Sequence, residues 1–215
     1  MHPIPGTPVT IVDLLRHGMP QGGGRYRGSL DDPLAEEGWA QMWEAAGRNP
    51  PWSVVVTSPL RRCAEFAVAL ARRDGLPVEQ DPRLREVGFG GWEGHRVAEL
   101  LATDPEPVRA YWRDPVAHPP PGGEPLPAFR ERVVAAWETL LARHEARHVL
   151  LVGHGGVLRM LLAHVLEMPL AGVLRLEVPH ASLTRIRVQP DINARRTASL
   201  VFHARTGGPP GAVDR

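Results

Sequence analysis

Residues 149–156 read Val-Leu-Leu-Val-Gly-His-Gly-Gly, and they decide which fold class we expect. The apolar residues 149–152 form a short run that ends at Gly153, which is typical of a buried strand. Residues 155–167 then space their apolar side chains as an amphipathic helix does. A strand that leads through a glycine-rich turn into a helix is the unit of α/β proteins, so this stretch predicts that class.

The same order of strand and helix recurs along the rest of the chain. Periodicity and turn residues predict further strands at 9–15, 52–57, 173–178, 182–188 and 198–203, and further helices at 35–47, 58–73 and 128–147. Alternating strands and helices imply a three-layer α/β fold, with a mostly parallel sheet and helices on both faces. The whole chain, residues 1–215, is expected to form a single domain.

Residues 86–127 interrupt this order. They contain short helical patterns at 97–101 and 107–113 and the proline-glycine run 119–123. A long irregular region is more often functional than idle, so we expect residues about 86–127 to be a cap inserted over one end of the sheet. The tail, about 206–215, is expected to be frayed.

The composition excludes several classes of function. The 25 basic residues, all of them arginine, nearly balance 24 acidic residues and leave a net charge of +1, which argues against nucleic acid or a membrane surface as partner. The absence of lysine excludes P-loop and Schiff-base chemistry. The single cysteine, Cys63, allows no internal disulfide. Because the sequence also shows no signal peptide and no unbroken apolar span, we expect a cytoplasmic protein, whose oligomeric state stays open.

The ends of three predicted strands carry the same residue types. Arg16-His17-Gly18 follows the first strand, Ser58-Pro59-Leu60-Arg61-Arg62 the second, and Gly153-His154-Gly155-Gly156 the strand at 149–152. Ligands of such sheets bind beyond the carboxyl ends of the strands, next to helix N-termini that favour anions. Arginine matches the oxygens of a phosphoryl group, and a cationic pocket keeps a histidine neutral and nucleophilic. These motifs predict a phosphoryl-binding site.

As an ordered set, the motifs resemble the histidine phosphatase superfamily, which includes the cofactor-dependent phosphoglycerate mutases. The resemblance extends over about residues 9–188 and is carried by Leu15-Arg16-His17-Gly18, residues 58–63, Leu84-Arg85-Glu86, residues 89–94 and residues 152–156. It implies a phosphoglycerate mutase-like fold and a phosphomonoester hydrolase. The substrate would be a small-molecule phosphate monoester, and neither a metal nor another cofactor would be needed.

The resemblance also implies a role for each matching residue. His17 would be the nucleophile that forms a phosphohistidine, and Glu86 would give a proton to the leaving oxygen. The phosphoryl group would be held by Arg16, Arg62, His154 and Gly155. Glu93 would be structural. Histidine, arginine and glutamate can supply nucleophile, charge stabilisation and acid/base catalysis without a metal, which agrees with this assignment independently.

The loop after the first histidine departs from the family pattern, because Met19, Pro20 and Gly23 stand where many members have other residues. This departure leaves the substrate contacts of the loop open: Arg25-Tyr26-Arg27 either replaces them or forms a solvated loop face. We assign Arg27 and Glu124 to the substrate pocket. The roles of Arg25, Arg27 and the proline-glycine loop 119–125 stay open. Residues 27–34 and 121–124 resemble the alpha-ribazole phosphatase branch, which acts in cobalamin assembly, and this resemblance implies alpha-ribazole 5'-phosphate as a substrate.

Three alternatives remain beside this interpretation. The chain could be a phosphoglycerate mutase-type phosphoryl transferase, or a phosphate-binding module without catalysis. The segment His144-Glu145-Ala146-Arg147-His148 also fits the zinc peptidase pattern His-Glu-x-x-His. That pattern needs both histidines on one continuing helix, whereas residues 149–152 predict a strand, so we expect His148 to lie beyond the helix end. Cys63 is not the nucleophile of a cysteine phosphatase, because position 69 is Ala69 and not the arginine that such a site needs.

Overall fold

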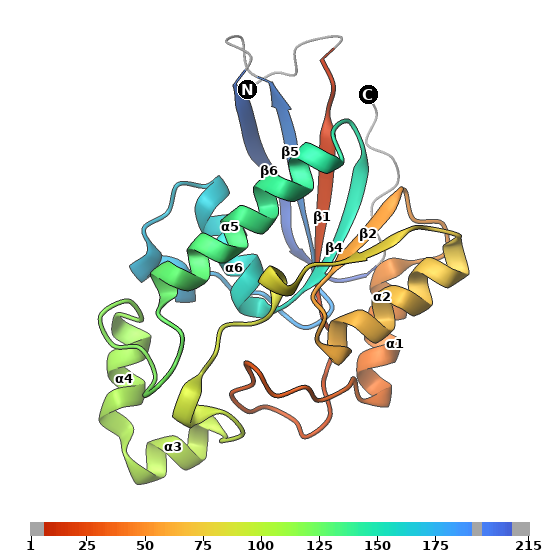
Figure 1. Cartoon of the computed structure of the whole chain (residues 1–215). Helices are drawn as coiled ribbons and strands as arrows, with labels where there is room; N and C mark the ends of the chain where they lie inside the picture. Colours follow the sequence, from red (N-terminus) through yellow and green to blue (C-terminus); the bar gives the residue numbers. More distant parts are fainter. Residues whose placement is uncertain (1–6, 191–194, 208–215) are drawn as a thin grey trace.

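The computed structural model describes residues 7–190 and 195–207 and places a six-stranded sheet at the centre of the molecule (Figure 1). The strand order is β3-β2-β4-β1-β5-β6. The strands are β1 (Thr10–Arg16), β2 (Val54–Thr57), β3 (Val78–Gln80), β4 (His148–Gly153), β5 (Leu183–Pro190) and β6 (Arg196–Arg205). The first four run parallel, and β5 and β6 are antiparallel to their neighbours. The sheet is therefore mostly parallel, as predicted.

Helices cover both faces of the sheet, because side chains of a strand point alternately to opposite sides. In β4, Val149 and Leu151 belong to the core under α5 (Leu126–Arg143) and α6 (Gly155–Val165). Leu150 and Val152 belong to a second core under α1 (Glu36–Ala46) and α2 (Arg61–Asp74). An unbroken apolar run is thus the signature of a strand buried on both faces. The three-layer fold class is confirmed.

The cap lies beyond the carboxyl ends of the parallel strands, at the lower left of Figure 1. It begins after the 3-10 turn η1 (Pro82–Leu84) and contains η2 (Gly90–Trp92), α3 (Val97–Thr103) and α4 (Pro105–Arg113). Its small core consists of Trp92, Val108 and Tyr111, and Tyr26 from the loop after β1 packs against it. The cap is thereby joined to the loop that follows the first histidine.

Some predicted elements differ from the structure. The predicted strand at 173–178 is instead the 3-10 helix η3 (Leu170–Arg175), because β1 is already paired on both sides and Val173 packs into the core beside α6. The three-residue strand β3 was not predicted, since it is too short to show a period. The helix predicted from Ser58 begins at Arg61, and the Ser58 hydroxyl accepts the N–H of Leu60 at 3.3 Å. Residues 208–215 of the predicted frayed tail lie outside the described residues.

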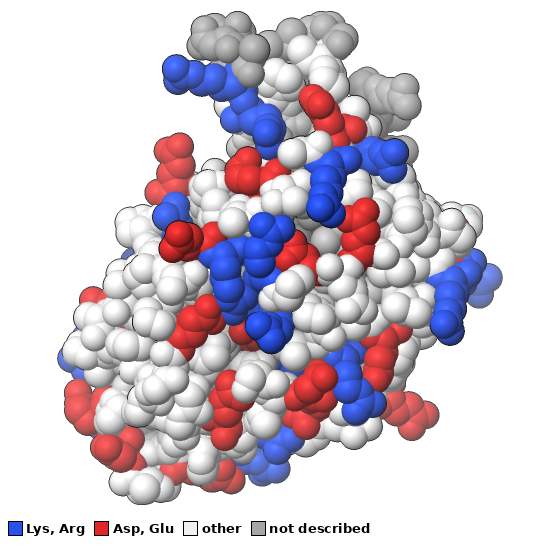
Figure 2. Space-filling view, in the orientation of Figure 1, with Lys and Arg blue, Asp and Glu red and all other residues white. Residues whose placement is uncertain are grey.

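The surface carries both signs of charge. Figure 2 shows arginine and carboxylate side chains interspersed over one face of the molecule. The mixed pattern agrees with the near balance of 25 basic and 24 acidic residues, which gives a net charge of +1. Among the described residues, no helix combines the length and apolarity that crossing a bilayer requires.

Candidate active site

The predicted histidines lie next to each other because β1 and β4 are parallel neighbours. Arg16 pairs with Gly153 in the register of the two strands, so His17 and His154 leave the sheet at the same edge. Their ring centroids are 5.3 Å apart, and both side chains are buried. β2 lies on the other side of β4 and brings Ser58 to this edge. Sheet topology alone therefore assembles the centre of the site.

A single hydrogen bond orients the ring of His17. Its Nδ1 lies 2.8 Å from the carbonyl oxygen of Gly18. A carbonyl can only accept, so Nδ1 carries the proton and Nε2 keeps its lone pair. Burial, followed by the charges of Arg16 and Arg62, holds the pKa of His17 well below its ordinary value of 6.5. His17 is therefore a neutral imidazole with a free nucleophilic nitrogen.

His154 is equally buried and lies at the N-terminus of α6. Its Nε2 is 2.7 Å from the Ser58 hydroxyl, and the Cys63 sulfur lies 3.7 Å from both ring nitrogens. Burial and the charge of Arg62 hold the pKa of His154 well below 6.5. Burial raises the pKa of the Cys63 thiol, so this cysteine is a small uncharged neighbour of the histidine.

Arg16 and Arg62 are fixed by the protein yet keep a free donor each. The terminal nitrogens of Arg16 lie 2.5 Å from the Val178 carbonyl oxygen and 2.9 Å from His180 Nε2. Those of Arg62 donate to the carbonyl oxygens of Leu30 at 2.6 Å and Gly28 at 3.1 Å. The Nε atoms of both arginines are buried and have no partner among the described residues. Buried donors without partners are rare, and an anion would satisfy both of these Nε–H groups.

Both arginines stay charged despite their burial. Burial lowers the pKa of Arg16 to about 10 and lowers that of Arg62, while the nearby carboxylate of Glu86 acts in the opposite direction on both. A guanidinium with a pKa of about 10 is protonated at neutral pH. Gly155 keeps the space in front of Arg16 open, because an added Cβ would lie 3.4 Å from its Nε. The site therefore carries two fixed positive charges, which suit a dianion.

Glu86 lies in the segment that follows η1, and it reaches the same site. Its Oε2 accepts the backbone N–H of Gly156 at 3.0 Å, and its Oε1 accepts that of Val87 at 3.0 Å. The Glu86 carboxyl group thus lies against the first turn of α6, at Gly156, which is two residues after His154. All five residues predicted to be catalytic, His17, Glu86, Arg16, Arg62 and His154, come together at one edge of the sheet.

The two residues assigned to the substrate pocket are engaged by their neighbours. Arg27 donates its Nε to Asp32 at 2.6 Å and a terminal nitrogen to the carbonyl oxygen of Gln21 at 2.8 Å. Arg25 binds the same carboxylate of Asp32 at 2.7 Å, so these two arginines shape the loop after His17. Glu124 pairs with Arg132 at 2.7 Å. Direct substrate contact by Arg27 or Glu124 stays a prediction.

Sequence reasoning missed two residues at this site. His180 has its ring centroid 5.5 Å from that of His17, and burial followed by the charge of Arg16 lowers its pKa to about 4. His180 lies just before β5. Because β5 is antiparallel to β1, it begins at the edge of the sheet where β1 ends, and this strand direction could have predicted that His180 lies near the site. Arg159 of α6 donates its Nε to the carbonyl oxygen of Leu176 at 2.9 Å, and its NH1 would lie 3.3 Å from a Cβ added at Gly155.

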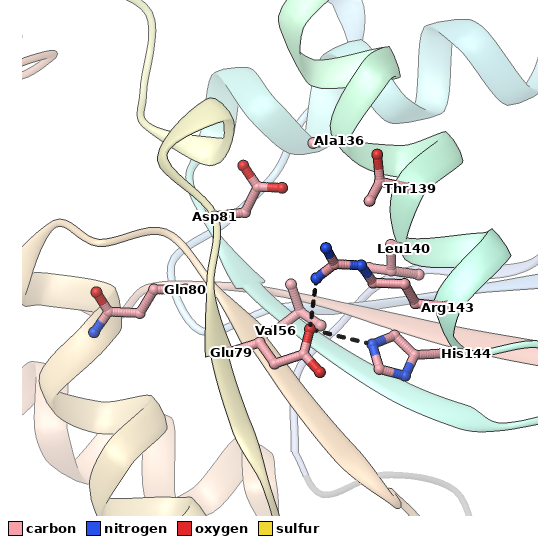
Figure 3. A pocket seen from close by; sticks show the side chains of 9 residues that line it. All are labelled: Val56, Glu79, Gln80, Asp81, Ala136, Thr139, Leu140, Arg143 and His144. Carbon is pink, nitrogen blue, oxygen red and sulfur yellow. Dashed lines mark ion pairs between the residues drawn. The ribbon is translucent and has the colours of Figure 1, made fainter.

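The zinc peptidase pattern is not formed. Helix α5 ends at Arg143, and His148 is the first residue of β4, where its Nε2 lies 3.0 Å from a carboxylate oxygen of Asp13. His144 instead points towards Glu79, with 3.5 Å between Nε2 and the carboxylate oxygen, in a separate pocket of about 290 Å³ (Figure 3). No group of three metal-ligating side chains occurs within residues 7–190 and 195–207. His144 and His148 therefore belong to different elements and different environments.

The site combines a neutral buried histidine, two buried arginines with unpartnered Nε–H groups and a carboxyl group at a helix N-terminus, which are groups that phosphoryl transfer can use. The comparisons with known proteins agree with this class. The family model of the histidine phosphatase superfamily (branch 1) matches residues 12–198. The chain belongs to this superfamily.

Three relatives are similar to the chain over most of its length. Glucosyl-3-phosphoglycerate phosphatase of Mycobacterium tuberculosis is 37% identical over 171 residues, which cover 74% of this chain and 76% of that protein. A solved structure of the mycobacterial enzyme has a TM-score of 0.80 at 31% identity and covers 92% of this chain and 100% of its own. The adenosylcobalamin/alpha-ribazole phosphatase of Escherichia coli is 30% identical over 199 residues, covering 91% of this chain and 96% of that protein.

The third relative is longer than this chain. The bifunctional protein Rv2228c of Mycobacterium tuberculosis is 37% identical over 184 residues, which are 83% of this chain and 50% of that protein. The chain thus spans about half the length of this relative. Relatives named for two different substrates match the chain at 37% and 30% identity, so what they share is a phosphatase site within the superfamily.

Proposed function

We propose that this protein is a phosphomonoesterase that works through a phosphohistidine at His17 and needs no metal ion. The observation that carries the proposal is the orientation of His17. Its Nδ1–H is committed to the carbonyl oxygen of Gly18, so Nε2 is left free in a pocket with the unpaired Nε donors of Arg16 and Arg62. A nucleophile beside fixed positive charges is what phosphoryl transfer requires.

In the first step, Nε2 of His17 attacks the phosphorus atom, and the ester P–O bond breaks. Glu86, in its protonated form, gives its proton to the leaving oxygen, and the product alcohol departs. Arg16, Arg62 and His154 hold the phosphoryl oxygens as charge moves between them. In the second step, water attacks phosphorus, Glu86 takes a proton from that water, and the P–N bond breaks. Inorganic phosphate leaves, and both His17 and Glu86 return to their starting states.

Hydrolysis is favoured over the mutase and binding alternatives. The two relatives reported above with an activity in their names are phosphatases, and the described residues include every group that the two steps use. A mutase would instead pass the phosphoryl group back to a second phosphoglycerate. Sustained exchange between two phosphoglycerates without release of inorganic phosphate would contradict the proposal.

The proposed substrate is a small phosphorylated metabolite. Two specific candidates follow from the relatives, glucosyl-3-phosphoglycerate at 37% identity and alpha-ribazole 5'-phosphate at 30%. The aromatic rings of the cap pack on one another, with centroids 4.9 Å apart for Tyr26 and Phe89 and 5.4 Å apart for Trp92 and Tyr111. These four rings are therefore packed against one another, whereas Trp112 of α4 is 46% exposed, so the aromatic rings do not decide between the two candidates.

A panel of phosphate monoesters ranked by kcat/KM tests the proposal. It contains both candidates, a phosphoglycerate, a sugar phosphate and p-nitrophenyl phosphate, with and without a chelator. We expect turnover of the aryl ester, no effect of the chelator, and at least one metabolite that is much better than the aryl ester. His17→Ala serves as the control. We expect it to be inactive and to trap none of the acid-labile phosphohistidine that quenching traps in the wild type. Turnover that the chelator abolishes and zinc or magnesium restores would contradict metal independence.

A further inference from the structure

Arg132 makes contact with the backbone that carries Glu86. Its Nη1 donates to the carbonyl oxygens of Arg83 at 2.6 Å and Arg85 at 2.7 Å. Its Nη2 donates to the carbonyl oxygen of Glu86 at 3.0 Å. Its Nε and Nη2 also donate to the carboxylate of Glu124, each at 2.7 Å. A guanidinium has five N–H groups, and here five acceptors take them all. Arg132 therefore has no donor left for a substrate.

The backbone that Arg132 holds has no strand partner. We call residues 83–88 the Glu86 segment; beyond η1 it runs as irregular chain between β3 and the cap. Irregular chain near a buried site must find partners for its carbonyl groups, and Arg132 supplies three of them. The guanidinium also stacks over the ring of Phe129, one turn earlier on α5, at 4.6 Å. The Glu86 segment is thus attached to a rigid helix on one side.

Glu124 extends this attachment to the other side of Glu86. Its carboxylate accepts the N–H of Gly88 at 3.3 Å, and its own N–H donates to the carbonyl oxygen of Gly88 at 2.8 Å. The Arg132–Glu124 pair therefore binds the chain before and after Glu86. Between these two contacts, the Glu86 carboxyl group extends to the N–H of Gly156 in α6.

We propose that Arg132, with Glu124 as its partner, is a positioning residue for the proton-transfer step: it holds the Glu86 segment so that the Glu86 carboxyl group reaches the leaving oxygen. This inference rests on the proposed function, in which Glu86 gives a proton to that oxygen. It also gives Glu124 a role that needs no contact with substrate. Attack by His17 and binding of the phosphoryl group depend on other elements and would not need Arg132.

The leaving group distinguishes a positioning role from a general structural one. A nitrophenolate leaves without help from an acid, whereas an alkoxide needs the proton in the transition state. We therefore compare kcat/KM for p-nitrophenyl phosphate and for an alkyl phosphate such as glycerol 2-phosphate. In Arg132→Lys and Arg132→Gln, we expect a loss of no more than about threefold on the aryl ester and about a hundredfold on the alkyl ester, the range of general acid catalysis.

A second variant moves Glu86 and leaves the Arg132 side chain in the protein. A Cβ added at Gly156 would collide with Glu86 Oε1, the far end of a flexible side chain, so Gly156→Ala displaces the carboxyl group while alanine suits the helix. We expect the same selective loss on the alkyl ester. Arg130→Gln is the matched control, because Arg130 is exposed on the same helix, and it should leave both rates unchanged.

The outcomes separate cleanly. Equal losses on the two esters in folded Arg132 variants, as judged by circular dichroism, would overturn the positioning role. If neither Arg132 variant folds, Gly156→Ala provides the test. A loss of kcat/KM on the alkyl ester alone supports the positioning role, because the placement of Glu86 is the feature that Arg132 and Glu124 maintain. An equal loss on both esters, or no loss, overturns that role. A wild-type protein that hydrolyses no monoester would instead refute the proposed function itself.

Discussion

Individual hydrogen bonds decide the chemical state of the residues in this site. The carbonyl oxygen of Gly18 selects the tautomer of His17, and the Nε donors of Arg16 and Arg62 are buried without a partner among the described residues. His180 extends this logic, because Arg16 can only donate, so the Nε2 of His180 must accept. With a pKa lowered to about 4, His180 stays a neutral acceptor over the physiological range. It orients the arginine without adding charge.

We expect His180→Leu to weaken binding of the phosphoryl group. The substitution leaves a nitrogen of a buried guanidinium without its acceptor, and a hydrogen bond to a charged group contributes about 1.5–3 kcal/mol. kcat/KM for p-nitrophenyl phosphate should fall at least about tenfold, since a tenfold change corresponds to about 1.4 kcal/mol. His180→Gln keeps an acceptor and should lose less. Steady-state kinetics with inorganic phosphate as a competitive inhibitor measure the effect, and equal rates in both variants and the wild type would contradict it.

At the scale of elements, close backbone contact fixes how α1 and the loop after β1 sit together. A Cβ added at Gly18 would collide with the carbonyl oxygen of Gly38, and a Cβ added at Gly38 would collide with that of Met19. Neither obstacle is a flexible side chain. The helix therefore packs directly against the backbone whose carbonyl group orients His17.

Gly38→Ala is expected to push α1 away from this loop. Overpacking of this kind costs about 1–3 kcal/mol of unfolding free energy, and the shift should also lower kcat because it moves Gly18. Gly172→Ala is the matched control, since no atom lies within 4 Å of the Cβ it adds and the change should stay within about 0.5 kcal/mol. Urea unfolding and steady-state kinetics on both variants give the answer. Equal stability of the two would show that the contact relaxes freely.

A buried ion pair joins β1 to β5. Arg185 donates to both carboxylate oxygens of Asp13, at 2.7 and 2.9 Å, and both side chains are almost fully buried. The indole N–H of Trp52 adds a third bond to Asp13 at 2.8 Å. Burial by itself would raise the pKa of Asp13, but the hydrogen bonds from Arg185 and His148 bring it below its ordinary value. The carboxylate is therefore charged and depends on its partners.

Removing one partner should be strongly destabilising. We expect Arg185→Leu to lower the unfolding free energy by about 3–5 kcal/mol, because it leaves a buried charge with too few partners. Arg61→Gln breaks an exposed pair with Glu65, 2.7 Å long, and should have a much smaller effect on stability. Both values come from urea titrations at neutral pH. A loss below about 1 kcal/mol in Arg185→Leu would mean that Trp52 and His148 suffice for Asp13.

For the whole molecule, the buried histidines of the site make stability depend on pH. The pKa values of His17 and His154 lie well below 6.5, mainly through burial, and that of His180 is about 4 for the same reason. The unfolded chain binds protons at each of them near pH 6.5, whereas the folded chain does not. Below pH 6.5 the unfolded state therefore binds more protons, and folding is weakened as the pH falls.

We expect the unfolding free energy to be constant above about pH 7 and to fall between pH 6.5 and 4.5. Each histidine contributes a slope of up to about 1.4 kcal/mol per pH unit, so three give a slope of up to about 4 kcal/mol per pH unit. Urea unfolding at four pH values in this range measures the slope. His180→Gln should reduce the slope by one histidine's share, and an unchanged free energy from pH 7 to 4.5 would contradict the expectation.

Much of this protein could be predicted from local patterns. The apolar run 149–152 predicts a strand buried on both faces, because its side chains reach both cores. The motifs at the ends of the strands bring His17 and His154 together, because parallel neighbours end at one edge of the sheet. Residues whose partners follow from strand direction alone were therefore accessible to sequence reasoning.

The amino-acid sequence by itself determined the α/β class, the strand-end motifs and the family, since periodicity and motif order are properties of short segments. Only the tertiary structure decided that residues 170–175 form a 3-10 helix, that His180 holds Arg16, and that Arg132 holds the Glu86 segment. The physical reason is the same in each case. A local pattern records which face of its own element a side chain occupies, whereas the partner of a strand edge, a guanidinium or a carbonyl group is set by the packing of segments far apart in the chain.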